Sequence, residues 1–416
     1  MKKKTPQIRL AKTISVCSGI MFGMIKNFKK ITGLILVGLV VFFLLFIFVI
    51  LPAFASPKVY ESSSALIKSS SKATSTPVVT VPPITHIKPP RAVKSIYMTQ
   101  CIAGSKTLRK RLIKLAQDTE INAIVINIKD ETGKVSIKTD NPLFIEAYET
   151  AGCRAPDMQE LVSILHKNNI YAIARIAVFQ DPDLVKKHPA WAVKRASDGA
   201  VWRDRKGIPW LEVKATPVWD YVAELAKESE KIGFDEINFD YIRFPSDGNM
   251  KDIAYTYYKP ELETKAEAVK DFFKGLSLRT KDLGIPVSVD LFGMASTNYD
   301  DLGIGQILEN ALPYFDFVTL MVYPSHYPAG YNGYKKPATV PYEIVKYNLD
   351  IAVKRAIAAS SSPLKLRPWI QDFDLGADYT APMIRAQIEA TYDAGLTSWM
   401  AWDPRNIYTT GGYLPN

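Results

Sequence analysis

The chain is poor in histidine, with four in 416 residues. Only His326 follows the end of a segment predicted to be a strand, whereas a zinc or two-metal hydrolase needs several histidines that converge on one ion. We therefore expect no metal site and no cofactor. The sequence also lacks GxxxxGK[ST] and GxSxG, and no GxGxxG follows a predicted strand. Nucleotide binding and hydrolysis by a serine triad thus have no support.

Acidic residues are missing from residues 1–30, which carry eight Lys or Arg, so most of the formal net charge of +10 lies in this basic tail. From Ser95 to the C-terminus there are 38 Lys and Arg against 41 Asp and Glu. This part has no run of like charge that would follow a phosphate backbone. Nucleic acid is therefore not an expected partner.

Charge is absent from residues 31–51, a run long enough to span a bilayer, since a helix needs about 20 apolar residues to cross the hydrocarbon. A buried core helix would be shorter and amphipathic. Lysines flank the run only on its N-terminal side, so the positive-inside rule places residues 1–30 in the cytoplasm and everything after the run outside. We expect a single-pass transmembrane helix in the cell membrane. A signal peptide that ends at about Ala55 is the alternative, because Ala53-Phe54-Ala55 has the form of a cleavage site.

Cysteine is also scarce, with three in the chain. Cys17 lies on the expected cytoplasmic side, whereas Cys101 and Cys153 would be exported. In an oxidising compartment these two can form one disulfide. Two free thiols are the alternative, because the sequence gives no distance between them.

Residues 56–93 have no hydrophobic period, and 18 of these 38 residues are Ser, Thr or Pro. Such a composition buries too little apolar surface to offset the entropy of ordering, and its prolines keep the chain extended. We expect a disordered linker that holds the following domain away from the membrane.

From residue 94 to residue 416, short β-rich runs alternate with longer amphipathic runs, a pattern typical of β/α units around a parallel sheet. Eight predicted strands over about 320 residues favour a (β/α)8 TIM barrel, with a doubly wound open sheet as the alternative. The predicted strands are 95–99, 123–130, 171–179, 236–244, 286–293, 317–324, 366–373 and 398–404. The predicted helices are 107–119, 157–169, 218–233, 265–283, 340–359 and 381–395.

In such barrels the active site lies at the C-terminal ends of the strands. In the predicted strand 236–244, alternation with period 2 puts Glu236, Asn238 and Asp240 on the face that points into the barrel. The next strand places Asp290 on the same face, beside Asp240. A pair of inward carboxylates on neighbouring strand ends suits glycoside hydrolysis, in which one acts as acid and the other as nucleophile or base.

Several alternatives to this assignment stay open. Asp240 can be bridged to Arg243 or Arg175 inside the barrel without any catalytic role. Further carboxyl groups at or just after predicted strand ends are also candidates for the acid. Aromatic rings beside a carboxyl group would raise its pKa, as a general acid requires. These carboxyl groups are those of Asp130, Glu131, Asp372, Asp374 and Asp403, and the rings are those of Tyr323, Trp369 and Trp402.

The other polar and aromatic residues near strand ends suit sugar binding, because polar side chains bond to hydroxyl groups and aromatic rings stack on pyranose rings. The expected substrate-binding residues are Asn127, Arg175, Asn238, Tyr241, Arg243, Tyr323, His326, Trp369, Gln371, Asp372, Trp402 and Asp403, with Trp399 and Asn406 as further candidates.

The string GFDEINFDYIRFPSDG, followed in order by VSVDLFG, VTLMVYPSHY, RPWIQDFD and WMAWDPRN, resembles a family of uncharacterised bacterial glycoside hydrolases. The similarity spans Ala92 to Asn416. The resemblance implies a catalytic barrel distantly similar to α-amylase-type hydrolases, often preceded by a signal or membrane anchor, with Asp240 as the nucleophile on the fourth strand. Those enzymes use Glu as the acid after the fifth strand, where this chain has Asp290, so the identity of the acid stays open.

Together these features predict a glycoside hydrolase that faces outward from the cell membrane and acts on a polysaccharide of the cell wall or an exopolysaccharide. Transglycosylation would use the same acids and differ in how water is excluded. The alternative from another class is a catalytically inactive carbohydrate-binding barrel anchored at the cell surface, since fold alone does not guarantee activity. The discriminating feature is whether Asp240 and a second carboxylate converge on one open cleft. The particular glycan, the stereochemical outcome and the oligomeric state are not encoded in any recognisable motif.

Overall fold

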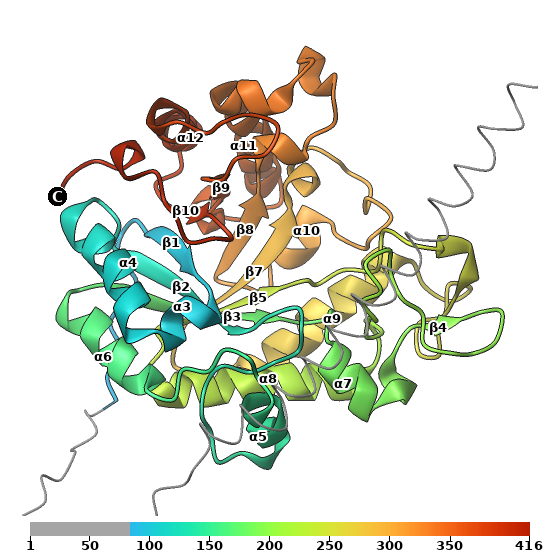
Figure 1. Cartoon of the computed structure of the whole chain (residues 1–416). Coiled ribbons are helices and arrows are strands. Elements are labelled where there is room, and N and C mark those ends of the chain that lie inside the picture. The colour runs from blue at the N-terminus through green and yellow to red at the C-terminus, as the bar shows by residue number, and fades with distance from the viewer. Residues whose placement is uncertain (1–83) are drawn as a thin grey trace, which may run out of the picture. The chain divides into compact units, whose positions relative to one another are not determined.

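A computed structural model describes residues 84–416 of the chain (Figure 1). The expected basic tail (1–30), the expected transmembrane helix (31–51) and most of the expected linker (56–93) lie outside the described residues. Within residues 84–416, no helix combines the length and the apolar character needed to cross a membrane.

Eight parallel strands close into a barrel, which confirms the predicted fold class (Figure 1). Each strand pairs with its neighbours around the ring, in the order β1, β10, β9, β8, β7, β5, β3, β2. Every predicted strand is present, although most end earlier than the sequence suggested. The barrel strands are β1 (Lys94–Met98), β2 (Ala123–Lys129), β3 (Tyr171–Ala177), β5 (Glu236–Asp240), β7 (Val287–Phe292), β8 (Phe317–Met321), β9 (Trp369–Gln371) and β10 (Trp399–Trp402).

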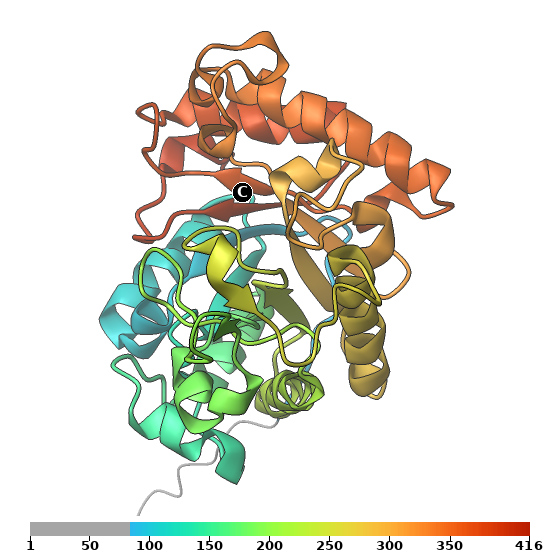
Figure 2. The ribbon, with the colours of Figure 1, turned by 90° about the vertical axis from the view of Figure 1, so that its right-hand side faces the viewer.

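All six predicted helices form within three residues of their expected ends and surround the barrel (Figures 1 and 2). α8 shows why: its apolar residues recur at helical spacing, and Gly233 ends it in the left-handed conformation, with φ 110°. α9 begins with a capping box between Thr264 and Glu267. The six are α4 (Lys106–Asp118), α6 (Met158–Lys167), α8 (Thr216–Ile232), α9 (Lys265–Thr280), α11 (Pro341–Ala358) and α12 (Ala381–Asp393).

Shorter elements in the connecting loops were not predicted, because they are too brief to show a hydrophobic period. The antiparallel pair β4 (Lys194–Arg195) and β6 (Ile253–Ala254) joins the loops after β3 and β5. These loops project from the barrel toward the viewer in Figure 2. The other short helices are α3 (Gln100–Gly104), α5 (Pro142–Glu149), α7 (Pro182–Lys187) and α10 (Leu308–Ala311), with 3-10 turns at Pro189–Trp191, Met250–Asp252, Gly293–Ser296, Pro324–His326, Tyr331–Gly333, Pro337–Thr339, Pro363–Lys365 and Thr410–Gly412.

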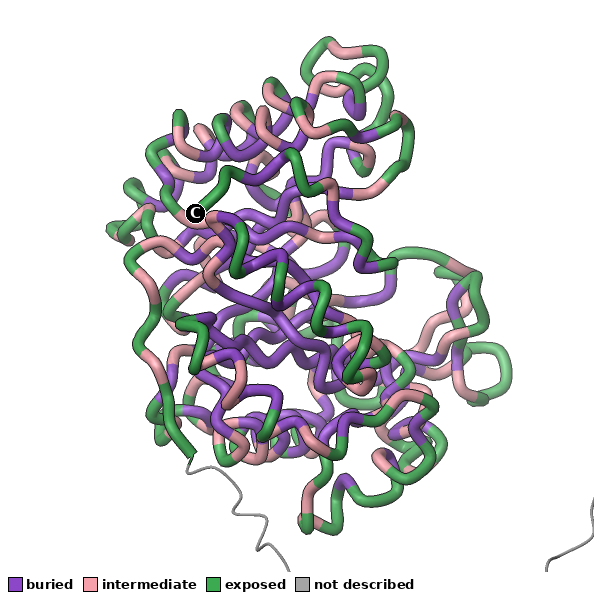
Figure 3. Tube along the Cα trace, turned by 60° about the vertical axis from the view of Figure 1, so that its left-hand side comes forward, coloured by how far each residue is buried: buried purple, intermediate pink, exposed green. Residues whose placement is uncertain are grey.

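The strands alternate between two buried faces, as predicted for β5 and β7. Ile237 and Phe239 of β5 belong to the large core between the strands and the helices. A second apolar cluster, which includes Tyr171, Tyr323 and Trp369, fills the barrel interior. Figure 3 shows that the strands are buried and that exposed residues gather on the loops and outer helix faces.

Polar side chains also fill part of the barrel interior. Glu236 of β5 accepts two hydrogen bonds from Nη1 of Arg367, at 2.9 and 3.1 Å, and both side chains are fully buried. Tyr171 and Ser288 donate further hydrogen bonds to the Glu236 carboxylate, at 3.2 and 2.7 Å. This pair ties β5 to Arg367, two residues before β9, across the interior.

Arg367→Met is expected to lower the free energy of unfolding by about 3–5 kcal/mol, because it leaves the Glu236 charge buried without its cation. Urea denaturation followed by tryptophan fluorescence measures the change. The double variant Glu236→Gln with Arg367→Met is the control and should recover much of the loss, since it removes both charges. A loss below about 1 kcal/mol in the single variant would show that water or local movement compensates the charge.

The first described residues pass beneath the barrel, at the N-terminal ends of β3 and β5. Thr85 Oγ1 and His166 Nδ1 lie 3.2 Å apart, and Nδ1 of His86 lies 3.0 Å from the Phe234 carbonyl oxygen. The backbone N–H of Ile87 donates to Oδ1 of Asp235 at 2.7 Å. The chain therefore enters the domain at the end opposite to the C-terminal ends of the strands.

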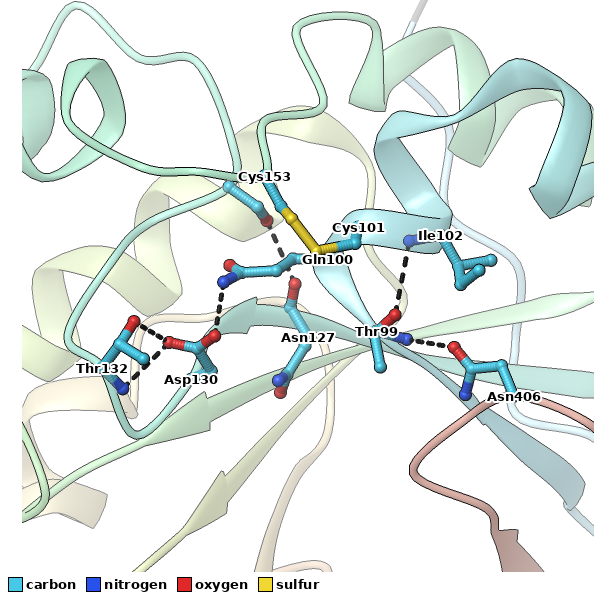
Figure 4. Close-up of a disulfide and its surroundings, with 10 residues drawn as sticks. Thr99, Gln100, Cys101, Ile102, Asn127, Asp130, Thr132, Cys153 and Asn406 are labelled. Atoms are coloured by element: carbon cyan, nitrogen blue, oxygen red, sulfur yellow. Dashed lines mark hydrogen bonds between the residues drawn. A yellow bond between two sulfur atoms is a disulfide. The ribbon is translucent and has the colours of Figure 1, made fainter. Parts of the chain in front are cut away.

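Cys101 and Cys153 form a disulfide, with their Cα atoms 4.7 Å apart, so the structure favours the bridge over the two free thiols that the sequence left as the alternative (Figure 4). It joins α3, just after β1, to the loop before α6. Figure 4 also shows two neighbouring hydrogen bonds. The backbone N–H of Thr99 donates to Oδ1 of Asn406, and the Thr132 hydroxyl group donates to Oδ1 of Asp130.

Replacing both Cys101 and Cys153 with Ala is expected to lower the free energy of unfolding by about 4 kcal/mol. The bond closes a loop with a sequence separation of 52 residues, and the loss follows from the extra entropy of the unfolded chain. Thermal unfolding with and without dithiothreitol measures it: the reductant should lower Tm of the wild type and leave the double variant unchanged. An equal effect of reductant on both proteins would contradict a stabilising bond.

Candidate active site

A cavity of about 240 Å³ opens among residues at the C-terminal ends of the barrel strands. It receives residues from β3, β5, β7, β8, β9 and β10 and from the loops that follow them. The lining residues are Arg175, Asp240, Tyr241, Arg243, Asp290, Phe292, Gly293, Met294, Gln306, Met321, Tyr323, His326, Tyr327, Trp369 and Trp402.

Asp240, the last residue of β5, faces the cavity and is held at both carboxylate oxygens. Its Oδ2 accepts a charge-assisted hydrogen bond from Nη2 of Arg175, and its Oδ1 accepts from the backbone N–H of Tyr241 at 2.5 Å. Tyr241 itself has φ 57°, a left-handed conformation that is uncommon for a bulky residue. Such strained backbone tends to gather at functional sites.

Asp290 lies on the neighbouring strand β7 and is 1 % exposed. Its Oδ1 accepts hydrogen bonds from Nδ2 of Asn238 at 2.9 Å, from Nε1 of Trp369 at 3.0 Å and from the Thr319 hydroxyl group. Its Oδ2 accepts none and lies 3.9 Å from Nε of Arg175. Asp290 and Asp240 thus flank one guanidinium group.

The two carboxyl groups differ in their electrostatic surroundings. Burial, and then the nearby charge of Asp240, raises the pKa of Asp290 to about 7, although Arg175 and the hydrogen bonds to Oδ1 oppose the shift. Oδ1 accepts from the N–H groups of Asn238 and Trp369, so we expect the proton of the neutral form on Oδ2. Asp240 holds its direct ion pair with Arg175. The site therefore combines an ion-paired carboxyl group with a second carboxyl group whose pKa lies near neutral pH.

Aromatic rings surround this pair. The rings of Trp402 and Tyr97 stack with centroids 3.9 Å apart, and the ring of Trp369 meets Trp402 edge-on at 5.5 Å. The Arg175 guanidinium lies 5.0 Å from the centroid of Trp402. Burial and the charge of Asp240 raise the pKa of Tyr241 to about 12, so its hydroxyl group stays protonated and can donate to a ligand.

His326 also lines the cavity, where its ring meets that of Tyr323 edge-on with centroids 5.1 Å apart. Burial lowers the pKa of His326, so the imidazole is neutral at pH 7. A neutral imidazole carries one donor and one acceptor, which suits contact with sugar hydroxyl groups rather than with a charge.

Arg243 lines another part of the cavity wall and does not bridge Asp240, whose partner is Arg175. Its guanidinium lies 4.5 Å from the ring centroid of Trp210 and 5.2 Å from that of Phe292. Burial lowers its pKa.

The structure brings nine of the fourteen predicted site residues to the cavity. They are Arg175, Asp240, Tyr241, Arg243, Asp290, Tyr323, His326, Trp369 and Trp402. Asn127 and Asn238 lie directly behind this wall. Asn127 accepts from Nη1 of Arg175 at 2.6 Å, and Asn238 donates to Asp290, so each orients a cavity residue.

The structure places Gln371, Asp372 and Asp403 outside the cavity lining, contrary to the expectation of substrate contact. Gln371 bonds to the backbone of Ser325 and Phe373. Asp372 accepts from the Tyr413 hydroxyl group at 2.7 Å and from the Thr409 N–H at 3.0 Å, and Asp403 accepts from the Arg405 N–H at 2.5 Å. These polar groups are buried and hold the loops after β9 and β10 in place. Trp399 and Asn406 are likewise buried away from the cavity.

Six residues that line the cavity were not predicted. Four of them lie in loops or turns, where side chains do not alternate every two residues as they do in a strand. Gln306 is fixed from two sides, because its Oε1 accepts from the Phe292 N–H at 2.8 Å and its Nε2 donates to the Ile242 carbonyl oxygen at 3.0 Å. Gly293 allows a close approach, since a Cβ atom there would lie 2.3 Å from the Met321 carbonyl oxygen. The VSVDLFG string contains Phe292 and Gly293 and was the one signal that could have found them. The six are Phe292, Gly293, Met294, Gln306, Met321 and Tyr327.

Among residues 84–416, no group of three or more His, Cys, Asp or Glu side chains is arranged to hold a metal ion. The cavity lining contains carboxyl groups, guanidinium groups and aromatic rings.

A model of the family described as "Putative glycosyl hydrolase domain" matches residues 95–408, which include all eight barrel strands from Ser95 onward and the whole cavity. The chain belongs to this glycosyl hydrolase family. The family resemblance inferred from the sequence strings is thereby confirmed. A comparison with curated protein sequences gives no match.

Solved structures similar to this glycosyl hydrolase domain include a hypothetical protein from Ruminiclostridium thermocellum. It is 33 % identical, with a TM-score of 0.41, and the match covers 50 % of this chain and 98 % of that one. The α-L-fucosidase isoenzyme 2 from Paenibacillus thiaminolyticus is 14 % identical with a TM-score of 0.51, and the match covers 77 % of this chain and 48 % of that one. A chitobiase from Flavobacterium johnsoniae is 14 % identical with a TM-score of 0.50, covering 78 % and 48 %. The two enzymes share the fold with this domain.

Proposed function

We propose that this protein hydrolyses glycosidic bonds in a polysaccharide outside the cytoplasmic membrane, with Asp240 as nucleophile or base and Asp290 as general acid. One observation carries the proposal: two carboxyl groups on neighbouring strands face one cavity, and burial raises the pKa of one of them, Asp290, to about 7. Glycoside hydrolysis requires such a division of roles.

The geometry supports a sequence of proton and bond changes. The proton on Oδ2 of Asp290 passes to the glycosidic oxygen as the bond to the anomeric carbon breaks. The Asp240 carboxylate can bond directly to that carbon, and water then cleaves the resulting glycosyl ester while the deprotonated Asp290 takes the proton of this water. Alternatively, Asp240 takes a proton from a water molecule whose oxygen forms the new bond to the carbon. Arg175 holds Asp240 in place through its charge-assisted hydrogen bond.

The aromatic lining supports a carbohydrate substrate. Trp402, Tyr323 and Tyr327 present ring surface to the cavity, and pyranose rings offer apolar C–H faces that pack on such surfaces. Neutral His326 and the protonated hydroxyl group of Tyr241 add hydrogen-bonding groups at the same wall.

The convergence of Asp240 and Asp290 favours an enzyme over an inactive carbohydrate-binding barrel. A binding module would keep the aromatic residues, but it has no need for a buried carboxyl group with a raised pKa beside a second carboxylate.

The extracytoplasmic location rests on three features of the chain. The apolar run 31–51 follows a basic tail, and a linker rich in Ser, Thr and Pro follows it. The disulfide between Cys101 and Cys153 adds support, because such bonds persist mainly in oxidising compartments. A cell-wall glycan or an exopolysaccharide is the substrate that this location favours.

Release of reducing ends by the full-length protein, purified in detergent, from a panel of bacterial cell-wall and exopolysaccharide preparations tests the proposal. We expect release from at least one glycan. No release from any preparation, together with measurable binding to one of them, would favour the binding barrel instead.

A further inference from the structure

We infer that the cavity recognises a sugar residue bearing a carboxylate, such as a hexuronic acid, and that Arg243 is the group that binds this carboxylate. The inference rests on the proposed function and narrows its substrate class to acidic glycans. It derives from the position of Arg243 in the cavity wall and from the donors that its guanidinium leaves unused.

The guanidinium of Arg243 is only partly satisfied by the protein. Its Nη1 donates to the Phe244 carbonyl oxygen at 3.2 Å and to Oγ of Ser246 at 3.0 Å. Among residues 84–416, Nε and Nη2 have no hydrogen-bond partner, and Arg243 takes part in no ion pair. Two donors of a planar fork are therefore left for a ligand.

The buried arginines of the domain, in contrast, each form an ion pair with a carboxylate. Arg109 pairs with Asp157 at 2.8 Å, Arg367 pairs with Glu236 at 2.9 Å, and Arg355 pairs with a glutamate at 2.5 Å. Arg175 in the same cavity pairs with Asp240. Arg243 lacks such a direct partner, because the charges of Asp240, Asp247 and Asp204 act on it without forming an ion pair. A guanidinium in a cavity wall without a paired carboxylate indicates an anion that arrives with the substrate.

The surroundings hold the guanidinium in a fixed orientation. It lies between the rings of Trp210 and Phe292, at 4.5 and 5.2 Å from their centroids. Trp210 is itself fixed, because its Nε1 donates to Oδ2 of Asp204 at 3.1 Å. A stacked, pre-oriented guanidinium binds a carboxylate through two parallel hydrogen bonds at little cost in entropy.

The charge of the cavity wall agrees with this assignment. Arg175 and Arg243 contribute two positive charges, whereas Asp240 contributes one negative charge and Asp290 is neutral below about pH 7. Arg243 is therefore the arginine of the cavity wall that has no paired carboxylate. A carboxylate on the substrate would supply this partner, whereas a neutral sugar would not.

The size of the cavity limits what the occupant can be. At about 240 Å³ it lies below the roughly 300–1,000 Å³ typical of sites for drug-sized ligands, so it fits about one sugar ring. The carboxylate that reaches Arg243 must then belong to the ring in the cavity or to a short substituent on it.

The test compares one polysaccharide in two forms: a glucuronic-acid-containing bacterial exopolysaccharide, and the same polymer after chemical reduction of its carboxylates to alcohols. We expect full-length wild-type protein to cleave the acidic form with kcat/KM at least about 10-fold higher. Arg243→Met should bring the ratio close to one, and Arg243→Lys should restore part of the preference. Arg203→Met removes an exposed arginine outside the cavity and should keep the wild-type ratio. Equal cleavage of both forms by the wild type would overturn the inference and leave the proposed hydrolase standing.

A binding measurement separates the inference from the proposed activity. Isothermal titration of the full-length protein with D-glucuronate, D-glucose and inorganic phosphate should show binding of glucuronate alone, lost in Arg243→Met. This result without any glycan cleavage would sustain the carboxylate site while the hydrolase proposal fails. Binding of phosphate as tight as that of glucuronate would overturn the choice of a carboxylate, and binding of glucose as tight would overturn the charge recognition itself.

Discussion

Asp240→Asn is expected to reduce kcat for glycan cleavage by about 10³-fold or more, while the fold is retained. The amide has nearly the same shape as the carboxylate, but it carries no charge and is neither a nucleophile nor a base at neutral pH. Arg175 also loses its ionic partner and keeps only a neutral acceptor. Reducing-end release measures the activity, and circular dichroism establishes that the fold is unchanged.

Asp130→Asn is the matched control for this variant. Asp130 is also a carboxyl group just after a barrel strand, but it bonds to Gln100 and Thr132 and does not line the cavity. Its replacement should change kcat less than about 3-fold. If Asp240→Asn kept wild-type activity, the nucleophile or base would have to be another residue, and the proposed roles would be wrong.

Asp290→Asn is expected to reduce kcat by about 10²–10⁴-fold for glycans with unactivated leaving groups, the range that general acid catalysis contributes. A p-nitrophenyl glycoside of a sugar that the enzyme accepts should lose much less, because nitrophenolate leaves without being protonated. In the wild type, activity on glycans should fall as pH rises through about 7, since Asp290 loses its proton there. The variant should lack this limb of the pH profile.

Protein stability gives a second measurement of the same group. The pKa of Asp290 is about 7 in the folded protein and about 4 in an unfolded chain. Between these values the folded state binds more protons than the unfolded state, so this group makes the free energy of unfolding fall as pH rises from about 4 to about 7. Asp290→Asn removes this contribution, and the variant should therefore lose less stability than the wild type over that range. Urea denaturation at several pH values measures the difference.

Loss of activity on the nitrophenyl substrate equal to the loss on glycans would contradict the role of Asp290 as acid. Glu131 would then be the next residue to replace. It follows β2, is partly exposed, and its charge helps to raise the pKa of Tyr241, a residue of the cavity wall.

The strands and their inward residues could be predicted because a strand repeats every two residues and a parallel barrel is buried on both faces. That rule placed Glu236, Asn238, Asp240 and Asp290 inside, and the structure confirms each position. The same rule does not tell which of two nearby arginines forms an ion pair with an inward carboxylate. Arg175 and Arg243 were equal candidates to bridge Asp240, and only the fold shows that Arg175 does so.

The loop part of the site could not be predicted from periodicity. Gln306 and Tyr327 reach the cavity from segments with no regular spacing, and their positions depend on contacts between residues far apart in the chain. Aromatic content was also ambiguous by itself. Trp399 and Trp402 lie on one strand, yet Trp399 packs in the outer core and Trp402 lines the cavity.

The entry of the chain beneath the barrel has a consequence for how the domain can be cut or fused. Residues 85–87 bond to His166, Phe234 and Asp235, so a truncation after them would strip hydrogen bonds from the base of β3 and β5. A fusion partner joined ahead of Ile84, in contrast, is attached at the end of the barrel away from the cavity. The length of a tether joined there would set how far the opening of the cavity can move from the point where the tether is attached. The tether itself would not cover that opening.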